Sequence, residues 1–247
     1  MTVFSKYAPE FLHPAYDPEL LNAVPLAWGT TGVVINTKLV PSLKGAKSIS
    51  WKDILENPKY KAKVTFLDDA KENLHVALMI QGKAWATASE ADITAAFAYL
   101  KKVQGQIKIF TPEAEPVIEA SECGICMVFS GAGVRLSHQH PELTYLIPTE
   151  GATVWSDNFA IPANAPHAEW AHQFINAVIE DKSAAAFTNR TYYPTANKAS
   201  WALLQDHIRN STMIFPTAET FKSLHYLTDR EELLQLTDRL WTEFKSL

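Results

Sequence analysis

Trp155 and Asp157 place an aromatic ring and a carboxylate two residues apart in the segment GATVWSDNFAIPANA, residues 151–165. The segment is typical of a strand, and alternation along a strand puts both side chains on the same face. An indole face attracts a cation, and a carboxylate supplies the opposite charge. The pair predicts a site for an organic cation. The alternative, which the motif alone leaves open, is that Trp155 is a core residue and Asp157 caps a turn.

Asp69 and Glu72 are a second group of acids, placed where a predicted strand over 63–67 passes into a predicted helix over 68–82. Their spacing fits a capping box, in which both acids only satisfy helix amides. The same turn would lie at the carboxyl edge of a parallel sheet, where open α/β folds bind ligands. Both interpretations place the two acids at the start of the helix, and the second adds a cleft in front of them.

Cys123 and Cys126 form the only cysteine motif, C-G-I-C. This spacing occurs in redox motifs and in half of a zinc site, but no second ligand pair is present beyond His138 and His140. Apolar residues surround both cysteines, so we predict structural cysteines in a buried strand. A disulfide or redox role and a metal site are the alternatives, and we expect no cofactor and no metal.

The composition is that of an ordinary globular chain of 247 residues, with 47% apolar and 20% charged residues. A formal charge of −5 argues against a nucleic-acid partner and favours cationic ones. No apolar run approaches the roughly 18 residues that a membrane span needs. The first residues, MTVFSKYAPEFLHPAY, lack the basic start and apolar run of a signal peptide.

Strands and helices alternate along most of the chain, which predicts an α/β fold with a mainly parallel sheet. The predicted strands cover 24–36, 63–67, 106–110, 123–133 and 144–148. The predicted helices cover 68–82, 89–103, 168–180, 182–189 and 201–210, with a short one opened by Ser50. A capping box over Thr228–Glu231 predicts a C-terminal helix that packs through Leu233, Leu236, Leu240, Trp241 and Phe244.

Five segments together resemble the polyamine-binding periplasmic proteins of bacterial ABC importers, in the order of that family. They are VPLAWGTTGVVIN, LDDAKENLHVAL, VWSDNFAIPANA, YYPTANKAS and IFPTAET. The resemblance implies a type II periplasmic-binding-protein fold, in which two α/β lobes are joined by hinge strands and a ligand binds between them. The chain starts just ahead of the first hinge crossing, so we expect the first lobe to be incomplete.

The resemblance also implies the division of the chain. We expect 1–33 to hold the remnant of lobe one with the first hinge crossing, and 34–154 to form lobe two. Residues 155–215 should return to lobe one and be mostly helical, and 216–247 should form a helical segment that packs on lobe two. An incomplete lobe predicts exposed apolar surface and unpaired strand edges, which favour a homodimer or a swapped dimer.

The ligand residues that the resemblance implies lie at positions matching the family's motifs. Spermidine or putrescine would be the ligand, a membrane permease the partner and the periplasm the location. Phe129 stands where the family usually has tryptophan, Leu227 where some members have a ligand-binding glutamine, and Ala132 where putrescine-preferring members often have an acid. The implied ligand residues are Asp69, Glu72, Phe129, Trp155, Asp157 and Tyr193.

The leading prediction is therefore a solute-binding component and not an enzyme. The strongest alternative is a fragment of the same fold that binds no polyamine and serves only in association. A hydrolase that uses Asp69, Glu72 and Asp157 is a further alternative, although the capping argument disfavours it. An oxidoreductase based on Cys123 and Cys126 is the last alternative.

Overall fold

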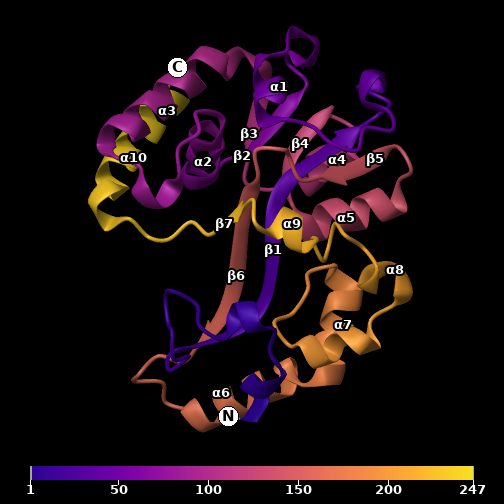
Figure 1. The fold of residues 1–247 in the computed structure, drawn as a ribbon, viewed down its shortest axis with the longest axis vertical. Helices are drawn as coiled ribbons and strands as arrows, with labels where there is room; N and C mark the ends of the chain where they lie inside the picture. Colours follow the sequence, from indigo (N-terminus) through magenta and orange to yellow (C-terminus); the bar gives the residue numbers. More distant parts are fainter. Residues whose placement is uncertain (1, 247) are drawn as a thin grey trace. The chain divides into compact units, whose positions relative to one another are not determined.

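The computed structural model describes residues 2–246, which form two compact units (Figure 1). Unit 1 contains the chain up to Gly29 together with Trp155–Thr217, and unit 2 contains Thr30–Val154 together with the chain from Ala218 onward. The chain passes between the units within two strands and again after Thr217. The units divide after residues 29, 154 and 217, and the resemblance placed the boundaries after 33, 154 and 215.

The sheet has seven strands in the order β3-β2-β4-β1-β6-β7, and β5 pairs with β1. The strands are β1 (Ala23–Asn36), β2 (Val64–Leu67), β3 (Ile107–Thr111), β4 (Ile125–Phe129), β5 (Leu143–Leu146), β6 (Ala152–Ala160) and β7 (Leu224–His225). Strand β2 runs parallel to β3 and β4, and β6 runs parallel to β7, but β1 runs antiparallel to β4 and β5. The sheet is thus mixed, and the prediction of a mainly parallel sheet is wrong because local sequence patterns do not encode strand direction.

Unit 2 carries helices on its strands. They are α1 (Trp51–Glu56), α2 (Ala70–Ile80), α3 (Glu90–Val103), α4 (Glu115–Glu119), α5 (Ser130–Gln139), α9 (Ala218–Phe221) and α10 (Glu231–Lys245). In Figure 1, α2, α3 and α10 lie together on one side of β2, and α5 lies on the other side with β4 and β5. Short 3-10 helices cover Pro41–Leu43, Pro58–Tyr60, Trp85–Thr87 and Gln104–Gln106.

The main core of unit 2 joins α2, α3 and α10. The predicted stripe of α3 is buried at Ile93, Ala96, Phe97 and Leu100, and a complete capping box between Ser89 and Asp92 opens this helix. The predicted packing face of α10 is confirmed as well. Its buried members are Leu233, Trp241 and Phe244, and Leu236 and Leu240 pack partly buried against the same cluster.

The predicted capping box at the start of α10 is wrong. The helix begins at Glu231, its N-cap residue is Arg230, and no side chain caps it. Tertiary contacts fix this entry instead, since the Arg230 guanidinium donates to the carbonyls of Trp85 and Ala88. The Thr228 carbonyl accepts from the Trp85 indole at 2.9 Å.

The predicted strand over 123–133 begins at Ile125 and ends at Phe129, four residues early, and Gly131 and Gly133 lie in α5. Gly133 explains the close packing of this helix, because a Cβ there would lie 2.5 Å from the Tyr145 ring of β5. The prediction of one helix over 201–210 is also wrong. The chain forms a 3-10 helix over Lys198–Leu203 and then the short helix α8 (Asp206–Arg209).

The α-helices of unit 1 are α6 (Ala168–Ile179), α7 (Asp181–Thr191) and α8. Its 3-10 helices include Thr2–Lys6 and Pro9–Phe11. A small cluster of Val24, Ile175 and Ile179 forms one part of its core.

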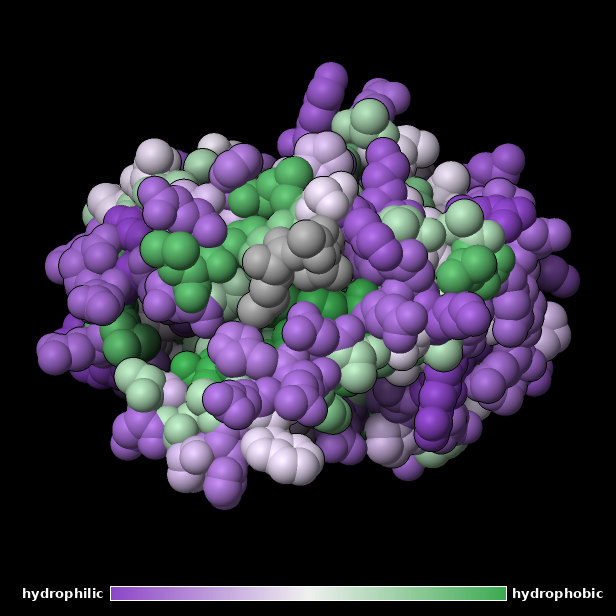
Figure 2. Space-filling view, turned by 90° about the horizontal axis from the view of Figure 1, so that it is seen from below, coloured by the Kyte–Doolittle hydropathy of each residue, from purple (hydrophilic) through white to green (hydrophobic). Residues whose placement is uncertain are grey.

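On α6, Trp170 is 73% exposed and Phe174 is 61% exposed. Figure 2 shows that hydrophobic residues reach the surface among hydrophilic ones on the face drawn. No helix in the described residues is both long enough and apolar enough to span a bilayer.

Candidate functional site

Asp69 occupies the turn between β2 and α2, as the sequence predicts. Its carboxylate accepts a hydrogen bond from the Glu72 backbone N–H at 3.0 Å, which satisfies one of the free amides at the helix start. The residue is exposed, so the rest of its carboxylate faces solvent. Asp69 therefore caps α2 and still presents negative charge at the surface of unit 2.

Glu72 does not complete the capping box, because its side chain turns toward the sheet. Its Oε1 accepts from the Thr31 hydroxyl of β1 at 2.8 Å, and its Oε2 accepts from the Thr153 hydroxyl of β6 at 2.7 Å. Glu72 is only 7% exposed. A buried carboxylate requires hydrogen-bond donors, and two strand hydroxyls supply them here. The reciprocal half of the predicted capping box is thus wrong.

The surroundings of Glu72 set its protonation near neutral pH. Burial raises the pKa of its carboxyl to about 7, the Thr153 and Thr31 hydroxyls act to lower it, and the charge of Asp69 raises it. Burial is the largest of these effects. Glu72 therefore exchanges a proton close to neutral pH, while Asp69 lies exposed three residues away.

His75 extends this buried polar group along α2. Its Nδ1 lies 3.0 Å from the Thr153 hydroxyl oxygen, and the side chain is 1% exposed. The exposed imidazole of His225 on β7 packs edge to face against it, with ring centroids 5.5 Å apart. Burial, and secondly His225, lower the pKa of His75 to about 3, so its ring is neutral at physiological pH.

Thr31, Thr153 and His75 are functional candidates that the sequence did not predict. The one available signal was the spacing of Glu72 and His75, which places them on the same face of a helix. Thr31 and Thr153 lie 41 and 81 positions from Glu72, so no local pattern could have paired them with it.

Phe129 ends β4 and stands at the N-cap position of α5, half-buried in unit 2. Strand β4 runs parallel to β2, with Thr65 paired to Cys126. The carboxyl ends of both strands therefore meet at one edge of the sheet. Phe129 and the acids that follow β2 belong to that edge.

Trp155, Asp157 and Tyr193 lie in unit 1. The Trp155 and Tyr193 rings are in contact, with centroids 5.4 Å apart and planes inclined by 60°. Both rings are half-buried, and Asp157 is exposed on the strand face that it shares with Trp155. Neighbouring protein atoms nevertheless take enough water from its carboxyl to raise the pKa of Asp157. This group offers two aromatic walls beside one carboxylate.

Cys123 and Cys126 are both buried free thiols in or beside β4. A contact with the Cys123 thiol, together with burial, raises the pKa of Cys126, which keeps it a poor nucleophile. Within residues 2–246, no group of three or more His, Cys, Asp or Glu side chains is arranged to hold a metal ion.

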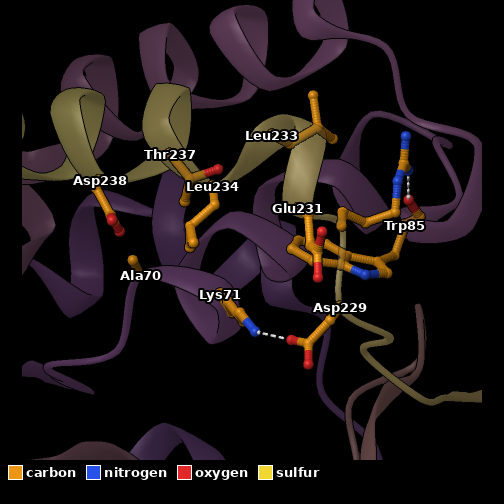
Figure 3. Close-up of a pocket in the computed structure, with 10 residues that line it drawn as sticks. Ala70, Lys71, Trp85, Asp229, Glu231, Leu233, Leu234, Thr237 and Asp238 are labelled. Carbon is orange, nitrogen blue, oxygen red and sulfur yellow. Dashed lines mark hydrogen bonds and ion pairs between the residues drawn. The ribbon is translucent and has the colours of Figure 1, made fainter. Parts of the chain in front are cut away.

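A cavity of 390 Å³ lies in unit 2 where α2 faces α10 (Figure 3). Trp85 and Leu233 form apolar walls, and the Lys71 ammonium donates to the Asp229 carboxylate at 2.6 Å. Arg230, Glu231 and Asp238 add further charges to the lining, which includes none of the residues predicted to bind ligand. We assign no ligand to this cavity.

Comparisons with known proteins agree with this architecture. Residues 3–209 match the family described as bacterial extracellular solute-binding protein. The spermidine/putrescine-binding periplasmic protein of Escherichia coli is 31% identical over 232 residues, which cover 93% of this chain and 65% of that protein. The putrescine-binding periplasmic protein PotF of Escherichia coli is 28% identical over 94% of this chain and 66% of its own length.

A solved structure of the spermidine/putrescine ABC transporter substrate-binding protein PotD from Streptococcus pneumoniae superimposes with a TM-score of 0.84. It is 26% identical and covers 99% of this chain and 75% of its own. The predicted α/β fold of a periplasmic binding protein is confirmed. The chain spans 65% of the length of the first Escherichia coli relative.

Proposed function

Because the chain belongs to the bacterial extracellular solute-binding protein family, we propose that it is the solute-binding component of a polyamine ABC import system. Spermidine or putrescine is the proposed ligand, the permease of the importer the proposed partner, and the periplasm the proposed location. The names of the relatives support this assignment. The observation that carries it is the contact of Trp155 with Tyr193 beside Asp157, because two rings and an acid suit an alkyl ammonium.

Polyamines carry ammonium groups separated by methylene chains, so their sites need carboxylates and apolar walls. In unit 1, Asp157 would hold an ammonium while Trp155 and Tyr193 cover the methylenes next to it. In unit 2, Asp69 and Glu72 would hold an ammonium, with Phe129 as the aromatic residue of that group. Phenylalanine is a weaker cation–π partner than the tryptophan usual in the family, so we expect it to contribute less.

Titration calorimetry of the protein with spermidine and with putrescine tests this proposal. Asp157→Asn keeps the shape of the side chain and removes its charge. A hydrogen bond to a charged group contributes about 1.5–3 kcal/mol, so we expect affinity to fall by about 10- to 100-fold with little change in stability. Asp229→Asn is the matched control, because Asp229 is an exposed carboxylate paired with Lys71, and it should bind as the parent does.

If the parent releases no heat at millimolar polyamine, this chain does not bind polyamine, and the association-only alternative gains. Equal affinity in the parent and in Asp157→Asn would instead disprove the assignment of the ammonium site. The exposed Trp170 and Phe174 of unit 1 favour self-association. Sedimentation velocity would detect it as a dimer fraction that increases with protein concentration.

A further inference from the structure

A chain of buried polar groups runs from Glu72 through Thr153 to His75 inside unit 2. The distances are 2.7 Å from the Thr153 hydroxyl to Glu72 Oε2 and 3.0 Å from the same hydroxyl to His75 Nδ1. All three residues are at most 7% exposed. A single hydroxyl thus joins a carboxyl to an imidazole in a largely buried position.

A hydroxyl has one proton to donate, so its two contacts constrain each other. When Glu72 is ionised, both of its oxygens only accept, and Thr153 must donate to Oε2. The Thr153 oxygen then accepts from His75, which must carry its proton on Nδ1. The ionised carboxylate therefore selects one tautomer of the neutral imidazole.

Protonation of Glu72 reverses these directions. A proton on Oε2 is donated to the Thr153 oxygen, so the Thr153 hydroxyl turns and donates to His75 Nδ1. His75 then carries its own proton on Nε2. We propose that Glu72, Thr153 and His75 form a proton relay, in which the protonation of the carboxyl is coupled to the tautomer of the imidazole.

The proton balance of the relay is complete. One proton arrives from solvent at His75 Nε2, the Nδ1 proton passes to the Thr153 oxygen, and the former hydroxyl proton passes to Glu72. One proton is gained in total, and His75 is neutral at the start and at the end. Thr31 donates to Oε1 throughout, which keeps the carboxyl in place.

The charged and titratable neighbours of this relay are few among the described residues. Asp69, the N-cap residue of α2, lies near Glu72, and His225 on β7 faces His75. Strands β1 and β6 contribute the hydroxyls of Thr31 and Thr153, and the Trp85 ring lies 6.5 Å from the His75 ring. The elevated pKa of Glu72, about 7, brings the relay into the physiological range.

The relay gives a specific expectation for ligand binding, which rests on the proposed function. An ammonium near Glu72 favours the ionised carboxylate, so binding should release protons when the free protein holds Glu72 partly protonated. The same event should move the His75 proton from Nε2 to Nδ1. Binding of the proposed ligand would thus be coupled to the release of a proton from Glu72.

The test on the ligand-free protein is the ¹⁵N spectrum of its histidines from about pH 5 to about pH 9, where a neutral imidazole reports its tautomer. A His75→Asn variant identifies the signal of His75. We expect a change from the Nε2–H to the Nδ1–H tautomer as pH rises. In Glu72→Gln and in Thr153→Val, each close in shape to the parent residue, His75 should keep a single tautomer over the range.

A single tautomer of His75 in the parent over the whole range overturns the relay, and so does a change that persists in Thr153→Val. Circular dichroism shows whether each variant is folded. Calorimetry with putrescine in buffers of different ionisation enthalpy then counts the protons released on binding. If putrescine does not bind, the proposed function fails, while the ¹⁵N spectra still decide the relay.

Discussion

Replacing Glu72 by Gln should remove a pH dependence of stability that this buried acid imposes on unit 2. Burial raises the pKa of Glu72 from its usual 4.5 to about 7 in the folded protein. Between these two values the unfolded chain has lost the proton while the folded chain keeps it. The folded state binds more protons there, so stability falls as pH rises through this window and levels off above it.

The size of the effect follows from the same shift. At 1.36 kcal/mol per pKa unit, the difference corresponds to about 3 kcal/mol lost between about pH 4.5 and about pH 7. Gln keeps the length and shape of the side chain and carries no charge at any pH. In the Glu72→Gln variant, this loss of unfolding free energy between about pH 4.5 and about pH 7 should therefore be absent. Above about pH 7 the variant should be more stable than the parent.

Denaturant unfolding of the parent and of Glu72→Gln at about pH 5, 6, 7 and 8 measures the free energy of unfolding at each pH. Glu150→Gln is the matched control. Burial would raise the pKa of Glu150, but hydrogen bonds from the Ser50 hydroxyl and from the Lys52 and Trp51 N–H groups lower it overall. The stabilisation from Glu150 is lost only as pH falls through its lowered pKa, so the control should keep the parent's decline from pH 5 to 7. An equal decline in the parent and in Glu72→Gln would refute the reasoning.

Three further predictions concern packing and the aromatic walls. Phe244→Ala should cost about 3–5 kcal/mol in the free energy of unfolding, because this ring is fully buried against α3 and β3. Gly151→Ala should lower the melting temperature by several degrees, since Gly151 has φ +111° and its Cβ would lie 2.1 Å from a carbonyl oxygen, while Gly105→Ala, whose Cβ meets nothing within 4 Å, should not. Trp155→Ala should reduce polyamine affinity in calorimetry more than Phe129→Ala, because indole is the stronger cation–π partner, and the reverse order would contradict the assigned walls.

Helices with a strong apolar stripe could be predicted from the sequence because their packing follows from local periodicity. The stripe of α3 and the packing face of α10 are both buried as expected. The start of α10 could not be predicted, since the local capping pattern does not form. Arg230 fixes the start instead, and its guanidinium binds carbonyls more than 140 positions away. Tertiary contacts determine where α10 begins, and a short sequence window does not contain them.

The candidate site also depends on residues that are distant in sequence and that only the fold brings together. The aromatic and acidic residues of unit 1 lie near one another in sequence or follow a recognisable motif, and Trp155 and Tyr193 are in contact. The partners of Glu72 come from β1 and β6, and only the folded sheet brings them to α2. Sequence spacing found the acid but not the groups that decide whether it is charged.

Asp69 caps α2 and Glu72 lies three residues further on in its first turn, yet the fold gives them different chemistry. Asp69 lies exposed and accepts a backbone N–H, whereas Glu72 is buried and retains its proton up to about neutral pH. Two ionised acids so close would repel each other, and protonation of the buried one relieves that repulsion when no cation is bound. An ammonium bound at this pair, as proposed above, would reverse the balance, because it would stabilise the negative charge that burial and Asp69 disfavour. On the proposed function, the Glu72 carboxyl would thus lose its proton when a cation binds beside it.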